Sequence, residues 1–467
     1  MAKNVIFFFC DQFRPDALGF QGHPVVKTPN LDRLAAKGVI FNNAYCASPV
    51  CVPARASLFT GQYPHTHGIW NNHDHLKPDQ PMVIETLKEQ GYGTAAVGKL
   101  HFFPRTNAKR FDHLRLNDGH WGEYSAHVRW LESVAPEYAK REIVGYSTNK
   151  EETTIHGVMP DGQKSKLSHV HWGTSGIPKE YSEPVWIANE SISFLEQKKD
   201  KPFFLFVSFT GPHSPFLAPP PYDTLYPPDE IELPVNLREE LKSNKPKTQQ
   251  ELLRRKYGMD NITDQQMKEV MSYYYASITF IDEQIGRIIK KLEELSLIDD
   301  SILVFSADHG ELMGNHGLMF KGYIYEESCG IPLIISDNSI PPQKNNSLVS
   351  QVDIMPTLLD LLDVPVPDYM QGGSFRSLMD GTKDKIRDAA YAEIASPDHS
   401  LHRVGRISED WTFSCEVYRS NGIEEGELYD RVNDPSQEKN LFYSPEHSEI
   451  VKTEKAKIQS WYLKTVV

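Results

Sequence analysis

Short, uninterrupted runs of apolar residues constrain the fold of this 467-residue chain more than any other feature. Five such runs occur, at residues 5–10, 94–97, 203–209, 302–305 and 332–335. Their length is typical of β-strands, and the lack of alternating polar residues indicates that both faces of each strand are buried. Strands of this kind predict a parallel sheet that is covered by helices on each side.

Helical patterns lie between these runs. Thr28 and Pro29 predict the start of one helix, with Thr28 at the N-cap and Pro29 at the first helical position, and Gly38 predicts its end. A longer helix is predicted to begin at Thr263, whose capping-box partner is Gln266. The apolar residues of this second helix recur every three or four positions, which predicts one buried face. Alternating strands and helices indicate a large α/β domain.

Two stretches interrupt this pattern. Residues 106–180 are polar and rich in histidine, glycine and aromatic residues, and residues 214–262 are rich in proline and charge. We expect both to be excursions from the sheet that shape the rim of a substrate site. We predict a catalytic domain over residues 1–375 and a smaller C-terminal subdomain over residues 376–467, with a final amphipathic helix near residues 444–464.

The overall charge excludes some partners. The chain has 63 acidic and 49 basic residues, a net charge of −14, so it lacks the positive excess that nucleic acid binding needs. An anionic substrate is compatible with this net charge if positive residues gather locally at its binding site. No apolar stretch approaches the ~20 residues of a membrane-spanning helix, and the N-terminus has no secretory signal pattern, which predicts a cytoplasmic protein without a membrane partner. The five cysteines show no zinc-ligand spacing and fit a reducing compartment.

Chemically active side chains come directly after four of the apolar runs. In open parallel sheets, ligands bind beyond the carboxyl ends of the strands, so these side chains are expected at one edge of the sheet. Their convergence predicts a metal-centred hydrolytic site. The residues are Asp11, Gln12, Lys99, His101, His213, Asp308, His309 and Lys321.

The segment from Cys51 to Arg55 is the most specific signal. Pro53 suits the first turn of a helix that Gly61 ends, which places Cys51 at the helix N-terminus, where an anion is favoured. Arg55 lies one turn later on the same face. Taken alone, Cys51 is either a buried structural cysteine or a thiolate nucleophile activated by the helix N-terminus.

This segment resembles the C-x-P-x-R signature of the type I (formylglycine-dependent) sulfatase family, in the alkaline phosphatase-like superfamily. The similarity continues to residue 64 and recurs in the family's order along the rest of the chain. It implies an alkaline phosphatase-like α/β fold, with a large, mostly parallel sheet flanked by helices and a smaller C-terminal subdomain that has a short antiparallel sheet and a helix. The other matching segments are residues 28–34, 98–101, 211–213, 308–310 with Lys321, 427–430 and 433–435.

The resemblance implies that a separate maturation enzyme converts Cys51 to formylglycine. The hydrated aldehyde attacks the sulfur of a sulfate ester, and its second hydroxyl then allows sulfate to be expelled. Asp11, Gln12, Asp308 and His309 are implied to hold one divalent metal together with the formylglycine oxygen at position 51.

The same resemblance implies roles for the basic residues. Arg55 would steady the hydrate, and Lys99 and Lys321 would bind sulfate oxygens. His101 would accept the proton of the second hydroxyl. His213 or Lys321 would protonate the leaving oxygen.

Three positions depart from the commoner sulfatase pattern. Gln12 stands where many members have Asp, His309 where many have Asn, and Ala54 where Ser is common. A lower ligand charge and a nitrogen ligand make the site less suited to Ca²⁺ alone, so Mn²⁺ and Mg²⁺ are alternatives to it. Gln and His also occur in the family's phosphonate monoester and phosphodiester hydrolases, which is the alternative function. The pair Lys99 and His101 favours sulfate esters.

The substrate is predicted to be a small anion, a sulfated carbohydrate. Residues 63–75 come after the nucleophile helix and are dense in hydrogen-bonding side chains, which suits a sugar-sized pocket. A catalytically silent binder of sulfated glycans is a third hypothesis, disfavoured by the complete set of chemical groups. The sequence does not determine the oligomeric state, and a homo-oligomer is one of the alternatives. The substrate-binding candidates are His65, His67, Asn72, His169, His171 and Trp172.

Overall fold

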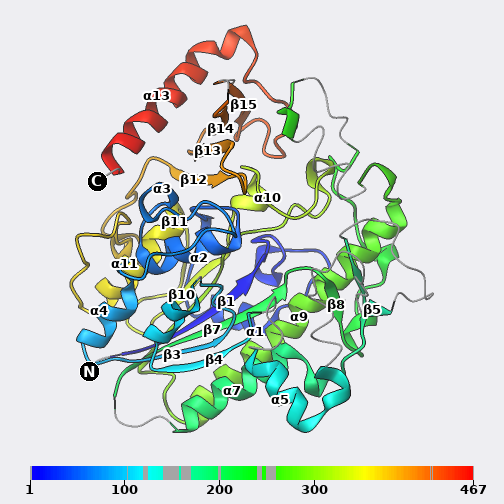
Figure 1. The fold of residues 1–467 in the computed structure, drawn as a ribbon, viewed down its shortest axis with the longest axis vertical. Coiled ribbons are helices and arrows are strands. Elements are labelled where there is room, and N and C mark those ends of the chain that lie inside the picture. The colour runs from blue at the N-terminus through cyan, green and yellow to red at the C-terminus, as the bar shows by residue number, and fades with distance from the viewer. Residues whose placement is uncertain are drawn as a thin grey trace.

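The structure is a computed structural model that describes residues 3–102, 104–118, 125–139, 157–158, 170–197, 201–238, 244–248, 259–420, 422 and 424–465. Figure 1 shows a large sheet at the centre of the molecule, with the C-terminal strands and α13 stacked above it.

The large sheet has eight strands in the order β11-β2-β10-β9-β1-β7-β3-β4. β1 lies at its centre and pairs in parallel with both β7 and β9, and β3 pairs in parallel with β7 and β4. The strands are β1 (Asn4–Asp11), β2 (Val39–Tyr45), β3 (Gly93–Gly98), β4 (His113–Leu116), β7 (Phe203–Pro212), β9 (Ser301–Ala307), β10 (Leu333–Ser336) and β11 (Gln343–Ser350).

All five strands predicted from apolar runs are confirmed, but the direction expected for one of them is wrong. β10 runs antiparallel to both β2 and β9. The sheet is therefore mostly, not wholly, parallel. The apolar runs did not indicate β2, β4 and β11, because strands near the edge keep partly exposed side chains and lack a continuous apolar run.

Helices cover both faces of this sheet. α1, α7 and α9 pack together on one face, while α2, α4 and α11 pack together on the other (Figure 1). The α-helices are α1 (Pro29–Ala35), α2 (Cys51–Thr60), α3 (Pro64–His67), α4 (Val83–Glu89), α5 (Ala126–Val134), α7 (Glu183–Gln197), α9 (Asp264–Glu294), α10 (Glu326–Cys329), α11 (Ile354–Leu361), α12 (Arg376–Met379) and α13 (Ser448–Thr465).

The predicted start of the long helix α9 is confirmed. The Thr263 hydroxyl accepts a hydrogen bond from Gln266 N, and the Gln266 side chain accepts one from Thr263 N. At α1 the cap differs from the prediction. Thr28 occupies the N-cap position, but its hydroxyl donates to Asp32, and the backbone N–H groups of the first turn donate to the carboxylate of Asp282 on α9 instead.

The two predicted excursions are only partly separate from the sheet. β4 lies within residues 106–180 and extends the edge of the large sheet, so that part of the expectation is wrong. Three other strands within the two excursions form a separate sheet. They are β5 (Gly157–Val158), β6 (Trp172–Ser175) and β8 (Phe216–Ala218). Because β8 and β6 pack against α9, the two excursions meet beside the long helix.

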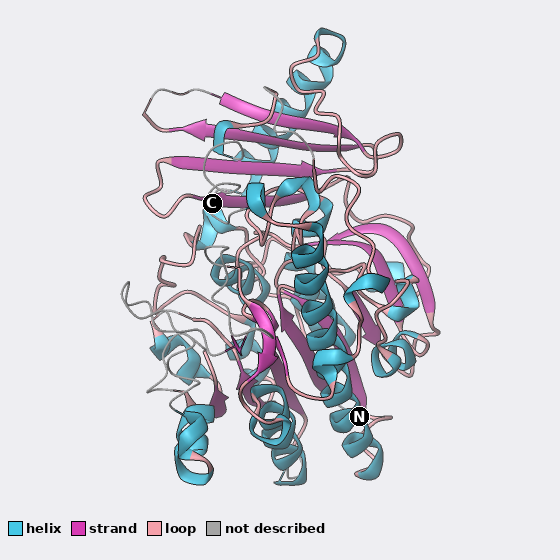
Figure 2. Ribbon diagram, turned by 90° about the vertical axis from the view of Figure 1, so that its right-hand side faces the viewer, coloured by secondary structure: helices cyan, strands magenta, loops and turns pink. Residues whose placement is uncertain are grey.

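The predicted C-terminal subdomain contains a separate antiparallel sheet of four consecutive strands (Figure 2). The final helix α13 packs against it and begins four residues later than predicted. The domain boundary at residue 376 falls at the start of α12 and stays a prediction. The strands are β12 (Ala390–Ala395), β13 (Leu401–Ile407), β14 (Trp411–Tyr418) and β15 (Glu424–Asp430).

Among the described residues, no helix has both the length and the apolar character that crossing a membrane requires.

The end of β3 is crowded in a way that permits only glycine. Gly98 has φ 96°, and a Cβ there would lie 1.9 Å from the carbonyl oxygen of Ser208. The next residue, Lys99, donates its N–H to that same oxygen at 2.9 Å.

We expect Gly98→Ala to lower the free energy of unfolding by about 3 kcal/mol or more, because it adds left-handed strain to a backbone clash. The matched control is Gly93→Ala at the start of the same strand, where the nearest atom to a Cβ is 4.0 Å away. Its effect should stay within about 1 kcal/mol. Denaturant unfolding measures both, and equal losses in the two variants would contradict this explanation.

Candidate functional site

Strand ends and one helix N-terminus meet at a single buried cluster. β1 ends at Asp11, β9 is followed by Asp308 and His309, and α2 begins at Cys51. All four side chains are buried, and one ligand atom from each lies within 4.8 Å of the others. The structure therefore brings together side chains that the sequence separates by up to 298 positions, from residue 11 to residue 309.

The sulfur of Cys51 is at the centre of this cluster. It lies 3.6 Å from Asp11 Oδ1, 3.3 Å from His309 Nε2 and 3.1 Å from Lys321 Nζ. The predicted helix is confirmed, since α2 (Cys51–Thr60) starts at this residue and ends at Gly61 in the left-handed conformation. An acidic, a basic and an imidazole group thus surround the sulfur.

Asn72, a predicted substrate-binding residue, lies at the N-terminus of the same helix. Its Oδ1 accepts a hydrogen bond from Val52 N at 3.0 Å. The residue at the N-cap, Val50, has no side chain that can do this. Asn72 therefore caps α2 from a separate loop, next to Cys51.

Arg55 is completely buried and links the two carboxylates. Its Nε donates to Asp308 Oδ2 at 2.9 Å, and its Nη2 donates to Asp11 Oδ2 at 3.2 Å. Its Nη1 donates to the carbonyl of Lys99 and to the hydroxyl of Ser208, at 2.7 and 3.1 Å. One side chain of α2 thereby connects the ends of β1, β3, β7 and β9.

Lys99 and His101, which come after β3, both reach the cluster. Lys99 Nζ lies 2.6 Å from Asp11 Oδ2, and the His101 side chain hydrogen-bonds Cys51. The backbone turns between them, because His101 has φ 60°. The N–H of His101 and that of the residue before it donate to Asp118 Oδ1, at 2.9 and 2.8 Å, which stabilises the turn.

Lys321 and Gln12 form a contact at the open side of the cluster. Lys321 Nζ donates to Gln12 Oε1 at 2.5 Å as well as to the sulfur of Cys51. The backbone N–H of Gln12 donates to Asp308 Oδ1 at 2.9 Å. The structure therefore places Lys321 beside the cluster instead of in a plain surface loop.

His213 comes directly after β7. Its Nδ1 donates to the carbonyl oxygen of Ser214 at 2.6 Å, which leaves Nε2 for other partners. It is half-buried and close enough to Asp11 for its charge to lower the pKa of that carboxyl.

Charge compensation within the cluster is uneven. At Asp11, the positive charges of Lys99 and Lys321 outweigh burial and hold the pKa of the carboxyl below its ordinary value. At Asp308, burial and the negative charge of Asp11 raise the pKa. Burial also opposes ionisation of the Cys51 thiol, but Lys321 and Lys99 lower its pKa. A further positive charge beside Asp308 would relieve this imbalance.

The donor set fits a divalent cation. His309 Nδ1 lies 2.9 Å from the carbonyl oxygen of Gly310, which only accepts, so Nδ1 donates and the Nε2 lone pair faces Asp11 and Asp308. An imidazole oriented in this way by a backbone carbonyl is the usual arrangement of a metal-bound histidine. Two carboxylates, an imidazole and an amide oxygen suit Ca²⁺, Mn²⁺ or Mg²⁺.

Two histidines predicted to bind substrate form packing contacts. Both ring nitrogens of His65 are bonded, to Glu393 at 2.7 Å and to Thr465 at 2.8 Å, and its side chain is not exposed. His67 Nε2 bonds the Ser57 hydroxyl at 2.9 Å, and its Nδ1 accepts from a backbone N–H. These contacts use both ring nitrogens of each histidine, so the structure gives no support to a role in substrate binding, and that role stays a prediction.

The candidates from the first excursion receive little support. Trp172 is 2% exposed, and its Nε1 donates to Glu269 at 3.3 Å, so it packs in the small sheet. His171 lies next to it, and its carbonyl accepts the N–H of Phe216. His169 lies outside the described residues.

Three further residues support the cluster that the sequence did not lead us to expect. Ser208 bonds Arg55, Asp118 holds the turn at His101, and Glu311 bonds the side chain of Gln12. Only Glu311 had a local signal, since it comes directly after the Asp-His-Gly segment.

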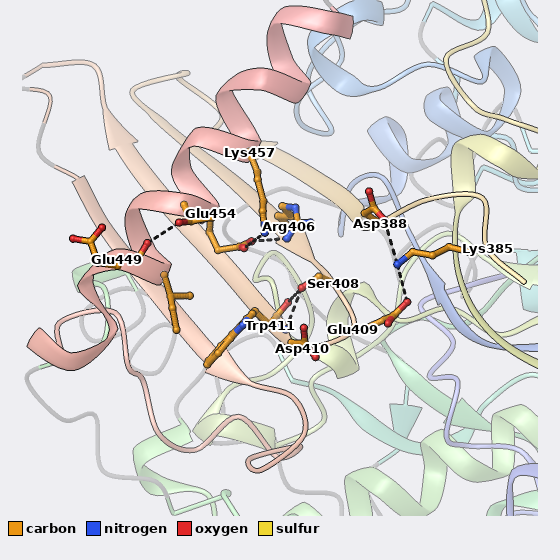
Figure 3. A pocket seen from close by; sticks show the side chains of 12 residues that line it. Lys385, Asp388, Arg406, Ser408, Glu409, Asp410, Trp411, Glu449, Glu454 and Lys457 are labelled. Carbon is orange, nitrogen blue, oxygen red and sulfur yellow. Dashed lines mark hydrogen bonds and ion pairs between the residues drawn. The ribbon is translucent and has the colours of Figure 1, made fainter.

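Away from this cluster, a hollow of about 360 Å³ lies between α13 and the C-terminal sheet (Figure 3). Several of its charged residues pair with one another. Arg406 and Lys457 both contact Glu454, at 2.5 and 2.7 Å, and Lys385 lies 3.1 Å from Glu409. The lining as a whole has five carboxylates and three basic side chains, so it lacks the local positive groups that Lys99 and Lys321 provide beside Cys51.

Comparison with known proteins agrees with this geometry. The sulfatase family model matches residues 3–364, and the family model described as N-sulphoglucosamine sulphohydrolase, C-terminal, matches residues 314–464. An arylsulfatase of Clostridium perfringens is 31% identical over 96% of this chain and 92% of its own.

Solved structures share the fold. The phosphonate monoester hydrolase of Agrobacterium radiobacter superposes with a TM-score of 0.82 at 24% identity, over 99% of this chain and 96% of its own. A protein in complex with its substrate D-glucosamine-2-N,6-O-disulfate superposes with a TM-score of 0.76 at 22% identity, over 100% and 98% of the two chains. The family model and the arylsulfatase match agree with the α/β architecture: the chain belongs to the sulfatase family, and it is a sulfuric ester hydrolase.

Proposed function

We propose that this protein hydrolyses the sulfate ester of a sulfated carbohydrate, with a formylglycine formed from Cys51 as the nucleophile. The observation that carries the proposal is the position of Cys51, at the start of α2 and within 4.8 Å of two carboxylates and an imidazole. The disulfated glucosamine bound by one structural neighbour supports a sugar as the substrate class.

Asp11, Asp308, His309 and Gln12 would hold a divalent cation together with the oxygen at position 51. When bound, the cation supplies a positive charge that polarises this oxygen and the sulfate group. Arg55 stays bonded to both carboxylates and keeps them in place. A maturation enzyme that acts on Cys51 is part of the proposal.

Basic side chains beside the cluster would neutralise the negative charge of the substrate. Lys99 and Lys321 would bind the sulfate oxygens, and each such donor typically contributes about 10²–10³ in rate. A formylglycine hydrate at position 51 would supply the oxygen that attacks sulfur, and His213 or Lys321 would protonate the alcohol as the ester bond breaks. His101, which contacts position 51, then takes the proton of the second hydroxyl as sulfate leaves.

A phosphonate monoester or phosphodiester hydrolase is the second candidate function. Gln12 and His309 favour it, and so does the close superposition on the phosphonate monoester hydrolase. Lys99 beside Asp11 and His101 beside Cys51 favour the sulfatase.

Replacing the nucleophile should abolish turnover. Cys51→Ala should lower kcat for an aryl sulfate by about 10⁴-fold or more, because no other residue can supply the attacking oxygen. The control is Cys415→Ala, a buried thiol in β14, which should stay active. Intact mass of the active protein should be about 18 Da below the unmodified value, which is the composition change of thiol to aldehyde. Full activity with an unmodified Cys51 would overturn the mechanism.

The acid part of the ester, sulfate or phosphonate, separates the two candidate functions. We expect kcat/KM for an aryl sulfate to exceed that for the matching aryl phosphonate by about 10-fold or more, since this difference corresponds to ~1.4 kcal/mol of transition-state stabilisation. Steady-state kinetics with the same alcohol in both esters measures the ratio. A preference for the phosphonate would instead support the second function.

Removing divalent cations should inactivate the enzyme. After treatment with a chelator, turnover should fall at least about 10-fold and return on addition of Ca²⁺, Mn²⁺ or Mg²⁺. The cation should also stabilise the chelated protein by about 2.7 kcal/mol at a concentration of 100 times Kd. Asp308→Asn should lose both responses. Undiminished turnover in a preparation shown by elemental analysis to be free of metal would refute the assignment.

A further inference from the structure

A single buried carboxylate connects two parts of the site that the sequence places far apart. Glu311 is not exposed, and its Oε2 accepts a hydrogen bond from Gln12 Nε2. Its Oε1 accepts from the backbone N–H groups of Met313 and Phe320, at 2.9 and 2.5 Å. Phe320 directly precedes Lys321, so the same side chain contacts a proposed metal ligand and the turn that carries a proposed sulfate-binding residue.

All three donors belong to residues with strained backbone. Gln12, Met313 and Phe320 have φ angles of 65°, 44° and 67°. The left-handed conformation costs roughly 1–2 kcal/mol for a residue with a side chain. Hydrogen bonds to a buried carboxylate are among the strongest in proteins and offset this cost. Glu311 therefore stabilises three unfavourable conformations at once.

The contacts of Gln12 determine which end of its amide faces the cluster. An amide has a donor end and an acceptor end. Its NH₂ faces Glu311 Oε2, and its Oε1 accepts from Lys321 Nζ at 2.5 Å. Lys321 only donates, so the amide oxygen of Gln12 must point toward Lys321 and Cys51. The hydrogen bonds to Glu311 and to Lys321 therefore require the same orientation of the Gln12 amide.

We propose that Glu311 is a positioning residue that orients the Gln12 amide with its oxygen toward the metal cluster and holds the turn that delivers Lys321. The inference rests on the proposed function. It also explains how a neutral glutamine can act as a metal ligand where many sulfatases have a carboxylate. A carboxylate presents an oxygen to the metal in either orientation, whereas an amide does so in only one.

The variant Glu311→Gln tests this orientation. The new amide can keep its oxygen toward Met313 and Phe320, but its NH₂ then faces the NH₂ of Gln12. To regain a hydrogen bond, the Gln12 amide must turn and present its donor end to Lys321 and the cation. We expect a 10- to 100-fold loss of Ca²⁺ affinity, which is typical when a partner of a metal ligand is removed.

The double variant Gln12→Glu, Glu311→Gln exchanges acceptor and donor. One oxygen of the new carboxylate at position 12 accepts from the new NH₂ at position 311, and the other faces Lys321 and the cation. We expect Ca²⁺ affinity at least equal to that of the wild type. A merely structural role for Glu311 predicts no such rescue.

The measurement is calorimetric titration of Ca²⁺, repeated with Mn²⁺, into the full-length, chelator-treated protein, with the state of Cys51 matched by intact mass. The control is Glu454→Gln, a buried carboxylate that bonds Arg406 in the C-terminal sheet. It should lower thermal stability without changing metal affinity.

The outcomes separate this inference from the proposed function. A wild-type protein that binds no divalent cation overturns the metal part of the proposed function and this inference with it. If the wild type binds, then Glu311→Gln with an affinity within threefold of it overturns the inference alone. If Glu311→Gln does not fold, the double variant decides: wild-type affinity supports the inference, whereas weak binding or failure to fold overturns it.

Discussion

The two carboxylates at neighbouring strand ends are the constraint on which this site depends. Asp11 and Asp308 are both fully buried, and two like charges ~4 Å apart repel by about 4 kcal/mol at an effective dielectric constant of 20. Arg55 resolves this by bonding one carboxylate through Nε and the other through Nη2. Since Arg55 lies one turn after Cys51 on α2, the helix that carries the proposed nucleophile also supplies the counter-charge.

The distribution of charge matches the chemistry of the family. The chain as a whole carries a net charge of −14, yet Lys99, Lys321 and His101 gather around Cys51. An anionic ester is therefore attracted by a local field and not by the surface as a whole. The same positive groups partly neutralise the two buried carboxylates, Asp11 and Asp308, so the cluster and its proposed substrate depend on one electrostatic arrangement.

The parts of the fold that the sequence predicts are those with a local physical signal. Central strands such as β1 and β7 are buried on both faces, and their apolar runs indicate them clearly. The edge strands β4 and β11 keep partly exposed side chains and gave no such run. The strand-end rule likewise indicated the candidate residues from Asp11 to Lys321, because the carboxyl ends of parallel strands lie at one edge of the sheet and the residues after them begin there.

The amino-acid sequence by itself determined the family, the five strands with continuous apolar runs, and the helix that begins at Cys51. Tertiary structure alone decided what each polar group contacts. Asn72 caps α2, His65 bonds Glu393 from 328 positions away, and Glu311 meets Gln12 across 299 positions. Such pairings leave no periodic or local pattern, because a hydrogen bond depends on where folding places two groups and not on their separation along the chain.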